Sequence, residues 1–154
     1  MSKYQVFFRE PEDFQPKIFG AACFLHSNGK ILLLKRAKNK SQELTWGSPG
    51  GKIEKDESPK QAAIREVYEE IGLVIEDEIE KLGTLYCRFP ELDYRMTFFY
   101  KSYSEFPNIH LNLDEHEDYG WFTYSEALNL NLIKFGKEAI DQLKKCDFNK
   151  FFAL

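Results

Sequence analysis

Cysteine, methionine, tryptophan and histidine are scarce in this chain of 154 residues, which contains three, two, two and three of them respectively. The cysteines, Cys23, Cys87 and Cys146, are widely spaced and form no C-x-x-C pair. Disulfide-rich scaffolds and cysteine zinc sites depend on such closely spaced pairs. The sequence therefore predicts neither.

Long apolar runs and an excess of positive charge are also missing. No apolar run approaches the ~20 residues needed to cross a bilayer, and no signal-like segment opens the chain, so we expect a cytoplasmic protein without a membrane partner. The formal net charge is −4 and the pI is near 5.5, which gives no reason to expect a stable nucleic-acid complex. A hydrophobic content of 43% predicts a single globular domain spanning residues 1–154.

Apolar segments separated by turn residues predict mixed secondary structure. Strands are expected at 18–26, 30–36, 46–54, 81–89, 95–103 and 119–122, and helices at 59–71, 125–128 and 135–145. Ser27-Asn28-Gly29 is typical of a hairpin turn between the first two strands. Strands with helices between and after them predict an α/β protein in which helices cover a sheet.

Residues 51–73, GKIEKDESPKQAAIREVYEEIGL, contain the most informative pattern. Ser58 and Pro59 form a helix start, and Gln61 completes a capping box with Ser58. Gly72 is a stop signal, so a helix over 59–71 is predicted.

On this helix, Glu66, Glu69 and Glu70 share an arc of roughly 100° at about 100° per residue. An apolar stripe for burial, formed by Ala63, Ile64, Val67 and Ile71, lies on the next arc. Arg65 can pair with Glu69, but one arginine does not neutralise three carboxylates. Hard divalent cations such as Mg²⁺, which prefer oxygen ligands, would offset the repulsion.

The segment resembles the Nudix box, G-x5-E-x7-R-E-U-x-E-E-x-G-U with U aliphatic, at every specified position. Such a coincidence has a chance probability on the order of one in a million. Pro49-Gly50-Gly51 resembles the family's glycine-rich entry, and weaker resemblance runs over about residues 18–128. Membership of the Nudix hydrolase family implies the Nudix fold, an α/β/α sandwich with a mixed β-sheet between helices.

The resemblance also implies an activity: Mg²⁺-dependent hydrolysis, with Mn²⁺ as a substitute, of a phosphoanhydride bond in a nucleoside diphosphate linked to a group X. It implies that Arg65 orients a catalytic carboxylate. The implied metal ligands are Glu66, Glu69, Glu70 and the carbonyl of Gly50. The general base stays open between a box glutamate, such as Glu66 or Glu69, and Glu115 or Glu117 of the acidic segment before Trp121.

The substrate is expected to be a small nucleotide. Lys35 and Arg36 are candidates for phosphate contact, and Trp46 and Phe89 for stacking on a base. His116 is either a base contact or an incidental loop residue. Trp-Gly-x-Pro-Gly-Gly resembles the lead-in of members that act on (deoxy)nucleoside triphosphates, which is the preferred class. Dinucleoside polyphosphates, ADP-ribose and nucleotide sugars are the alternatives.

Rival interpretations remain at this point. A catalytically silent nucleotide sensor would most simply lack a box glutamate, and none is missing. An isopentenyl diphosphate isomerase would need a cysteine and clustered histidines. The sequence leaves open whether the chain forms a homodimer, for which the pairs Phe7-Phe8, Phe98-Phe99 and Phe151-Phe152 are interface candidates.

Overall fold

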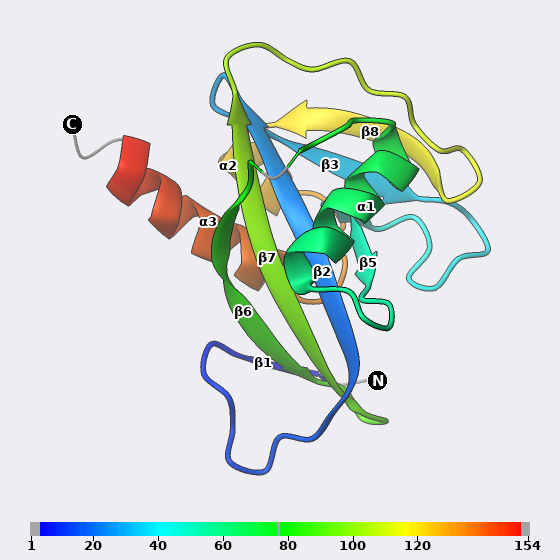
Figure 1. Cartoon of the computed structure of the whole chain (residues 1–154), viewed down its shortest axis with the longest axis vertical. Helices are drawn as coiled ribbons and strands as arrows, with labels where there is room; N and C mark the ends of the chain where they lie inside the picture. Colours follow the sequence, from blue (N-terminus) through cyan, green and yellow to red (C-terminus); the bar gives the residue numbers. More distant parts are fainter. Residues whose placement is uncertain (1–3, 77, 152–154) are drawn as a thin grey trace.

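The computed structural model describes the backbone of residues 4–76 and 78–151. Strands and helices alternate irregularly along the chain (Figure 1). The strands are β1 (Gln5–Phe7), β2 (Pro16–Ser27), β3 (Lys30–Arg36), β4 (Trp46–Gly47), β5 (Gly50–Lys52), β6 (Glu80–Arg88), β7 (Asp93–Tyr103) and β8 (His116–Phe122). The helices are α1 (Pro59–Ile71), α2 (Tyr124–Leu128) and α3 (Gly136–Phe151).

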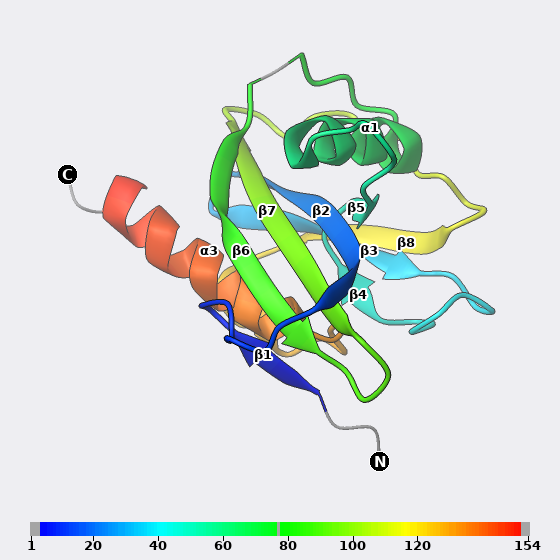
Figure 2. The same ribbon diagram turned by 60° about the horizontal axis from the view of Figure 1, so that its bottom comes forward.

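The strands form one mixed sheet in the order β1-β6-β7-β2-β3-β4, with β5 beside β2 and β8 beside β3. The long strands β2 and β7 run parallel, whereas the other paired strands are antiparallel. Helix α1 covers one face of the sheet and α3 the other (Figures 1 and 2). This arrangement confirms the predicted α/β architecture with a mixed sheet between helices.

Strand β2 supplies side chains to both faces, because successive residues of a strand point in opposite directions. Ala22 and Phe24 join the cluster that contains Ile140 of α3. Cys23 and Leu25 join the cluster on the other face, with the buried side of α1. Both helices are thus held by apolar contact with the same central strand.

The divergence of the β2–β3 hairpin opens the space in which the candidate site lies. The predicted hairpin is present, and its turn consists of Asn28 and Gly29, whose φ angles are 52° and 76°. Direct pairing of β2 with β3 covers only two residue pairs, His26/Ile31 and Ser27/Lys30. Farther from the turn, β2 pairs with β5, and β3 pairs with β4 and β8. The two strands therefore diverge and leave a gap in the sheet.

Helix α1 has the predicted bounds. The Oγ of Ser58 accepts a hydrogen bond from the backbone N–H of Gln61 at 3.1 Å, and the Gln61 side chain accepts one from the Ser58 N–H at 2.8 Å. Gly72 ends the helix in the left-handed conformation, with a φ of 70°. The capping box and the glycine stop are both confirmed.

Other boundaries differ from the predictions. Segment 46–54 is two strands, β4 and β5, because the chain switches its partner from β3 to β2 around Pro49, which has no N–H to donate. Strand β8 begins at His116, since Arg36 of β3 pairs with it despite the acidic composition of this segment. The short edge strand β1 was not predicted, and α3 extends to Phe151.

The aromatic pairs proposed for an interface fall in different environments. Phe98 and Phe99 are buried, with exposed fractions of 1% and 5%, so they belong to the interior. Phe8 is 51% exposed. The side chains of Phe151 and Phe152 lie outside the described residues. Among the helices of the described part, none is long and apolar enough for a membrane crossing.

Candidate active site

The acidic face of α1 carries three carboxylates in very different surroundings. The side chain of Glu69 is 51% exposed, that of Glu66 is 14% exposed and that of Glu70 is 4% exposed. Glu70 lies nearest the apolar stripe, so the packing that buries Val67 and Ile71 also takes Glu70 out of water. One face of the helix therefore carries one exposed, one partly buried and one buried carboxylate.

Arg65 ties this helix to the loop before it. Its guanidinium donates two hydrogen bonds to Glu57, from Nε at 2.7 Å and Nη2 at 2.9 Å, and one to the carbonyl of Lys52 at 3.0 Å. Nη1 also donates to Glu66 at 2.9 Å and Glu69 at 3.1 Å. These bonds lower the pKa of Glu57. Arg65 thus holds these carboxylates in place, and its role in orienting a catalytic carboxylate stays a prediction.

Both oxygens of Glu70 have partners from other parts of the chain. Oε2 accepts a hydrogen bond from the backbone N–H of Gly50 at 2.7 Å. Oε1 lies 2.5 Å from Nε2 of His116, whose side chain is 5% exposed. His116 is therefore a buried strand residue that contacts the box, and the interpretation as an incidental loop residue was wrong. Its signal in the sequence was only its position beside Glu115.

Burial shifts the ionisation of this group. It raises the pKa of Glu66 to about 7, with a further contribution from the neighbouring Glu70 carboxylate. It raises the pKa of Glu70 to about 8, against the opposing hydrogen bond from Gly50, and lowers the pKa of His116. Glu66 and Glu70 are poorly solvated and lie close to other carboxylates, so added positive charge would stabilise their ionised forms.

The donor atoms suit a divalent cation. One oxygen each from Glu70 and Glu115 and a ring nitrogen of His116 all lie within 4.8 Å of one another. Two carboxylates and an imidazole are ordinary ligands for such ions. A bound cation would also counteract the burial and the mutual repulsion that raise the pKa values of Glu66 and Glu70. The residues present therefore fit a metal ion.

The glycines before α1 allow close approach of the backbone. A Cβ on Gly50 would lie 2.5 Å from the Cβ of Ala22, and one on Gly51 would lie 2.5 Å from Oε1 of Glu66. Any side chain at Gly51 would push Glu66 out of place. The N–H of Gly50 donates a hydrogen bond to Glu70. The role of the Gly50 carbonyl as a metal ligand stays a prediction.

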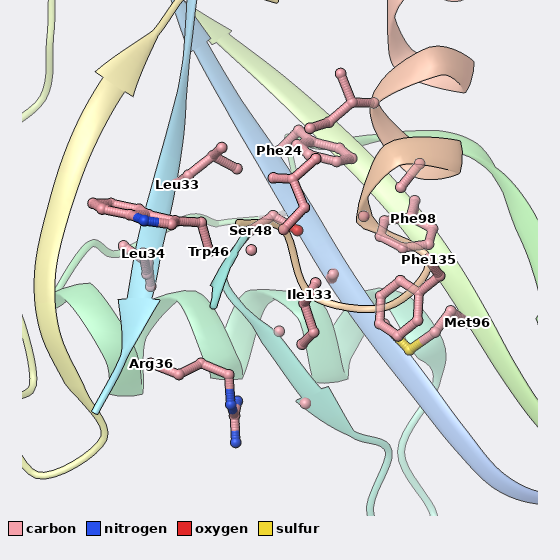
Figure 3. Close-up of a pocket in the computed structure, with 18 of the residues that line it drawn as sticks. Phe24, Leu33, Leu34, Arg36, Trp46, Ser48, Met96, Phe98, Ile133 and Phe135 are labelled. Atoms are coloured by element: carbon pink, nitrogen blue, oxygen red, sulfur yellow. The ribbon is translucent and has the colours of Figure 1, made fainter. Parts of the chain in front are cut away.

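A cavity of about 110 Å³ adjoins these residues in the gap between β2 and β3. Figure 3 shows Trp46, Phe24 and Phe135 projecting into it from different elements. Its polar part comprises Arg36, Ser48, Gly50, Gly51, Glu70 and His116. Its apolar part includes Phe24, Trp46, Tyr94, Met96, Phe98, Ile133 and Phe135. The carboxylate of Glu70 thus lies at the boundary between the acidic face of α1 and an apolar cavity.

The substrate-binding candidates separate into two groups. Arg36 and Trp46 line the cavity. Lys35 lies outside the lining and forms an ion pair with Glu117 at 3.5 Å. Phe89 also lies outside it and packs against the rings of Tyr4 and Tyr94. Sequence reasoning missed the wall contributed by Ile133 and Phe135, since nothing local marks that segment as part of a site.

Comparison with known proteins agrees with this architecture. Residues 16–143 match the NUDIX domain. The chain belongs to the NUDIX domain family. The resemblance drawn from residues 51–73 is confirmed, and so is the Nudix fold: a MutT protein structure from Methanosarcina mazei Go1 matches with a TM-score of 0.75 and 25% identity, over 88% of this chain and 97% of that one.

Two curated Nudix relatives are similar over shorter stretches. The CTP pyrophosphohydrolase of Escherichia coli K12 is 44% identical over 52 residues, which are 34% of this chain and 38% of the relative. The 8-oxo-dGTP diphosphatase of Proteus vulgaris is 34% identical over 80 residues, 52% and 69% of the two chains. The first match thus spans less than half of that relative. Nudix enzymes generally use a divalent metal, which fits the donor group around Glu70.

Proposed function

We propose that this protein is a Mg²⁺-dependent Nudix hydrolase that cleaves a phosphoanhydride bond of a nucleoside diphosphate linked to X. The observation that carries the proposal is that Glu70, which lies in one group with Glu115 and His116, also lines an apolar cavity. Charged phosphates need cations, whereas a nucleobase needs flat apolar surface. The two parts of the cavity meet those needs side by side.

Mg²⁺, with Mn²⁺ as a substitute, would be held by Glu66, Glu69 and Glu70, with Glu115 and the Gly50 carbonyl as further ligands. When bound, the ion neutralises phosphate charge and lowers the pKa of coordinated water. Glu70 is fixed for this role by the N–H of Gly50 and by His116. Arg65 keeps Glu66 and Glu69 from turning away, since it donates to both.

The chain's own groups account for positioning and proton transfer. Water attacks a phosphorus atom, the anhydride P–O bond breaks, and the leaving phosphate takes the electron pair. A carboxylate, Glu66 or Glu115, accepts the proton of the attacking water. Glu117 suits this role less, because Lys35 pairs with it. Arg36 contacts phosphate, and its guanidinium is held by the carbonyl and hydroxyl of Ser41 at 2.6 and 3.1 Å.

Nucleoside triphosphates are the proposed substrate class. The two relatives above are named for CTP and 8-oxo-dGTP, which are both triphosphates. Trp46 offers an indole face on the cavity wall for stacking on the base. Dinucleoside polyphosphates, ADP-ribose and nucleotide sugars are the alternative substrates for the same residues.

The test is turnover of a panel of these four substrate classes with and without Mg²⁺, with products separated by chromatography. Glu69→Gln is the test variant and Glu91→Gln, an exposed glutamate in another loop, is the matched control. We expect one class to be hydrolysed to a nucleoside monophosphate product, and the activity to vanish without Mg²⁺ and in Glu69→Gln only. Tight binding of a nucleotide without any turnover would overturn the proposal in favour of a sensor.

A further inference from the structure

A second hollow lies on the other flank of α1, away from the carboxylates. It has a volume of about 420 Å³ and is lined by Ser58, Pro59, Lys60, Lys81, Thr84, Tyr86, Arg95, Thr97 and Phe99. We call it the β6–β7 groove. In Figure 1 the first turn of α1 lies beside β7, and β6 is on the other side of that strand. The groove shares no lining residue with the cavity described above.

The lining of the β6–β7 groove is cationic. It includes Lys60, Lys81 and Arg95 and not one carboxylate, although the whole chain carries a net charge of −4. Within the described residues, neither Lys81 nor Arg95 forms an ion pair with a carboxylate. The guanidinium of Arg95 lies 4.6 Å from the ring centre of Phe19, which holds its position. The charges of Lys81 and Arg95 are therefore concentrated here, next to Lys60.

The floor of the groove adds hydrogen-bond donors. Thr84 and Thr97 are directly paired across β6 and β7, so their side chains share one face. Thr97 is only 6% exposed, and it lines the groove. A threonine hydroxyl can donate a hydrogen bond to a ligand that enters the groove.

The N-terminus of α1 contributes in the same direction. Ser58 and Pro59 reach the groove, and the first turn of the helix contains no acidic residue that would offset its positive end. The β6–β7 groove thus has cations on its walls, a hydroxyl donor on its floor and the start of a helix at its edge.

We propose that the β6–β7 groove binds a phosphate-type oxyanion. Lys81 and Arg95 pair with the anion, and the Thr97 hydroxyl donates a hydrogen bond to it. The oxyanion is either free phosphate or pyrophosphate, or the phosphate group of a nucleotide. The inference is independent of the proposed hydrolysis, because none of these residues touches the Glu70 group.

The test is an amide NMR titration of the full chain with inorganic phosphate, with a chelator present so that the carboxylate site holds no metal. We expect saturable shifts at Lys81, Thr84 and Thr97. Lys81→Gln and Arg95→Gln should each weaken phosphate binding about tenfold, the usual effect of losing a charge-assisted hydrogen bond. Lys17→Gln, an exposed lysine outside the lining, should bind phosphate as the parent does.

Thr97→Val tests the floor without disturbing the strand, since valine has nearly the same shape and favours β-structure. Its melting temperature without phosphate should equal or exceed that of the parent, and its phosphate affinity should fall. A lower melting temperature would show that the hydroxyl has an internal role and would overturn its assignment as a ligand contact.

Titrations with pyrophosphate and with a nucleoside monophosphate distinguish the sources. The oxyanion that saturates the groove at the lowest concentration identifies the source. Shifts confined to Arg36, Gly50 and Glu70, or equal phosphate affinity in the parent, Lys81→Gln and Arg95→Gln, would overturn the proposal. Turnover is not the readout, so failure of the hydrolase proposal leaves this result interpretable.

Discussion

The carboxylates of α1 and the apolar part of the cavity differ in how far apart in the sequence their residues lie. Glu66, Glu69 and Glu70 come from one turn of α1 and are brought together by helical spacing. Trp46 and Phe135 come from β4 and from the residue before α3, and only the folded chain brings them to one wall. The comparison teaches that local spacing specifies the chemistry, whereas long-range packing shapes the space for the substrate.

This difference predicts that the carboxylates of α1 and the apolar wall of the cavity control different kinetic constants. Loss of a carboxylate should lower kcat, because such groups act on the reacting phosphate. Loss of an aromatic wall residue should raise KM, because stacking is the same in the ground state and in the transition state.

The largest effect is expected for Glu66→Gln, which removes a charge from the carboxylates of α1 while keeping the size of the side chain. We expect kcat to fall about 10³-fold, the scale of losing a group that stabilises transition-state charge. Steady-state kinetics on the substrate identified by the panel would measure it, with Glu91→Gln as the control. Unchanged kcat in Glu66→Gln would remove this residue from the site.

His116 comes next, because it contacts Glu70 without belonging to the box. His116→Leu should weaken Mn²⁺ binding about 10- to 100-fold, the usual range for groups that orient metal ligands. Calorimetry with Mn²⁺ alone would measure this affinity. His116→Gln keeps a donor and should retain more of the affinity; equal losses in both variants would indicate a packing role only.

Arg65→Gln tests the connection between loop and helix. Removing the charge-assisted bonds to Glu57, Glu66 and Glu69 should cost about 2 kcal/mol in the free energy of unfolding at neutral pH. Urea unfolding in the presence of a chelator would give this value. An unchanged midpoint would contradict the structural role of Arg65.

The ion pair of Arg65 and Glu57 also predicts that stability depends on pH. Arg65 lowers the pKa of Glu57 in the folded state. The Glu57 contribution to stability is therefore fully present above the pKa of the unfolded chain and is lost as the pH falls through the lowered folded value. The stability difference between the parent and Arg65→Gln should shrink in acid, as urea unfolding at a series of pH values would show.

The smallest effect is expected for Trp46→Ala in the apolar part. We expect KM to rise about tenfold with little change in kcat, since base–aromatic stacking contributes roughly 1–3 kcal/mol. Trp46→Phe should retain most of the affinity because it keeps an aromatic face. A large fall in kcat with unchanged KM would contradict the proposed division of roles between the carboxylates of α1 and the apolar wall.

The sequence predicted the local features well because each rests on neighbouring residues. The capping box of Ser58 and Gln61, the stop at Gly72 and the turn at Asn28-Gly29 are all present. The pairing of strands was harder to predict. The break between β4 and β5 arises because the chain changes its neighbouring strand, and no local pattern marks that change.

The site residues show the same limit. Arg36 and Trp46 line the cavity, while Lys35, one residue before Arg36, points to Glu117 instead. The alternation of a strand sends neighbours to opposite faces, and the sequence did not reveal which face would meet the cavity. His116 looked unremarkable in its segment because its partner, Glu70, is distant in the chain.

By itself, then, the sequence determined the family, the acidic helix and the expectation of a divalent metal, because helical spacing places Glu66, Glu69 and Glu70 on one face. Only the tertiary structure decided which carboxylate is buried, that His116 and Gly50 hold it, and where the cavity lies. The reason is physical: burial and long-range hydrogen bonds arise when β2 and β3 diverge and α1 closes over the gap.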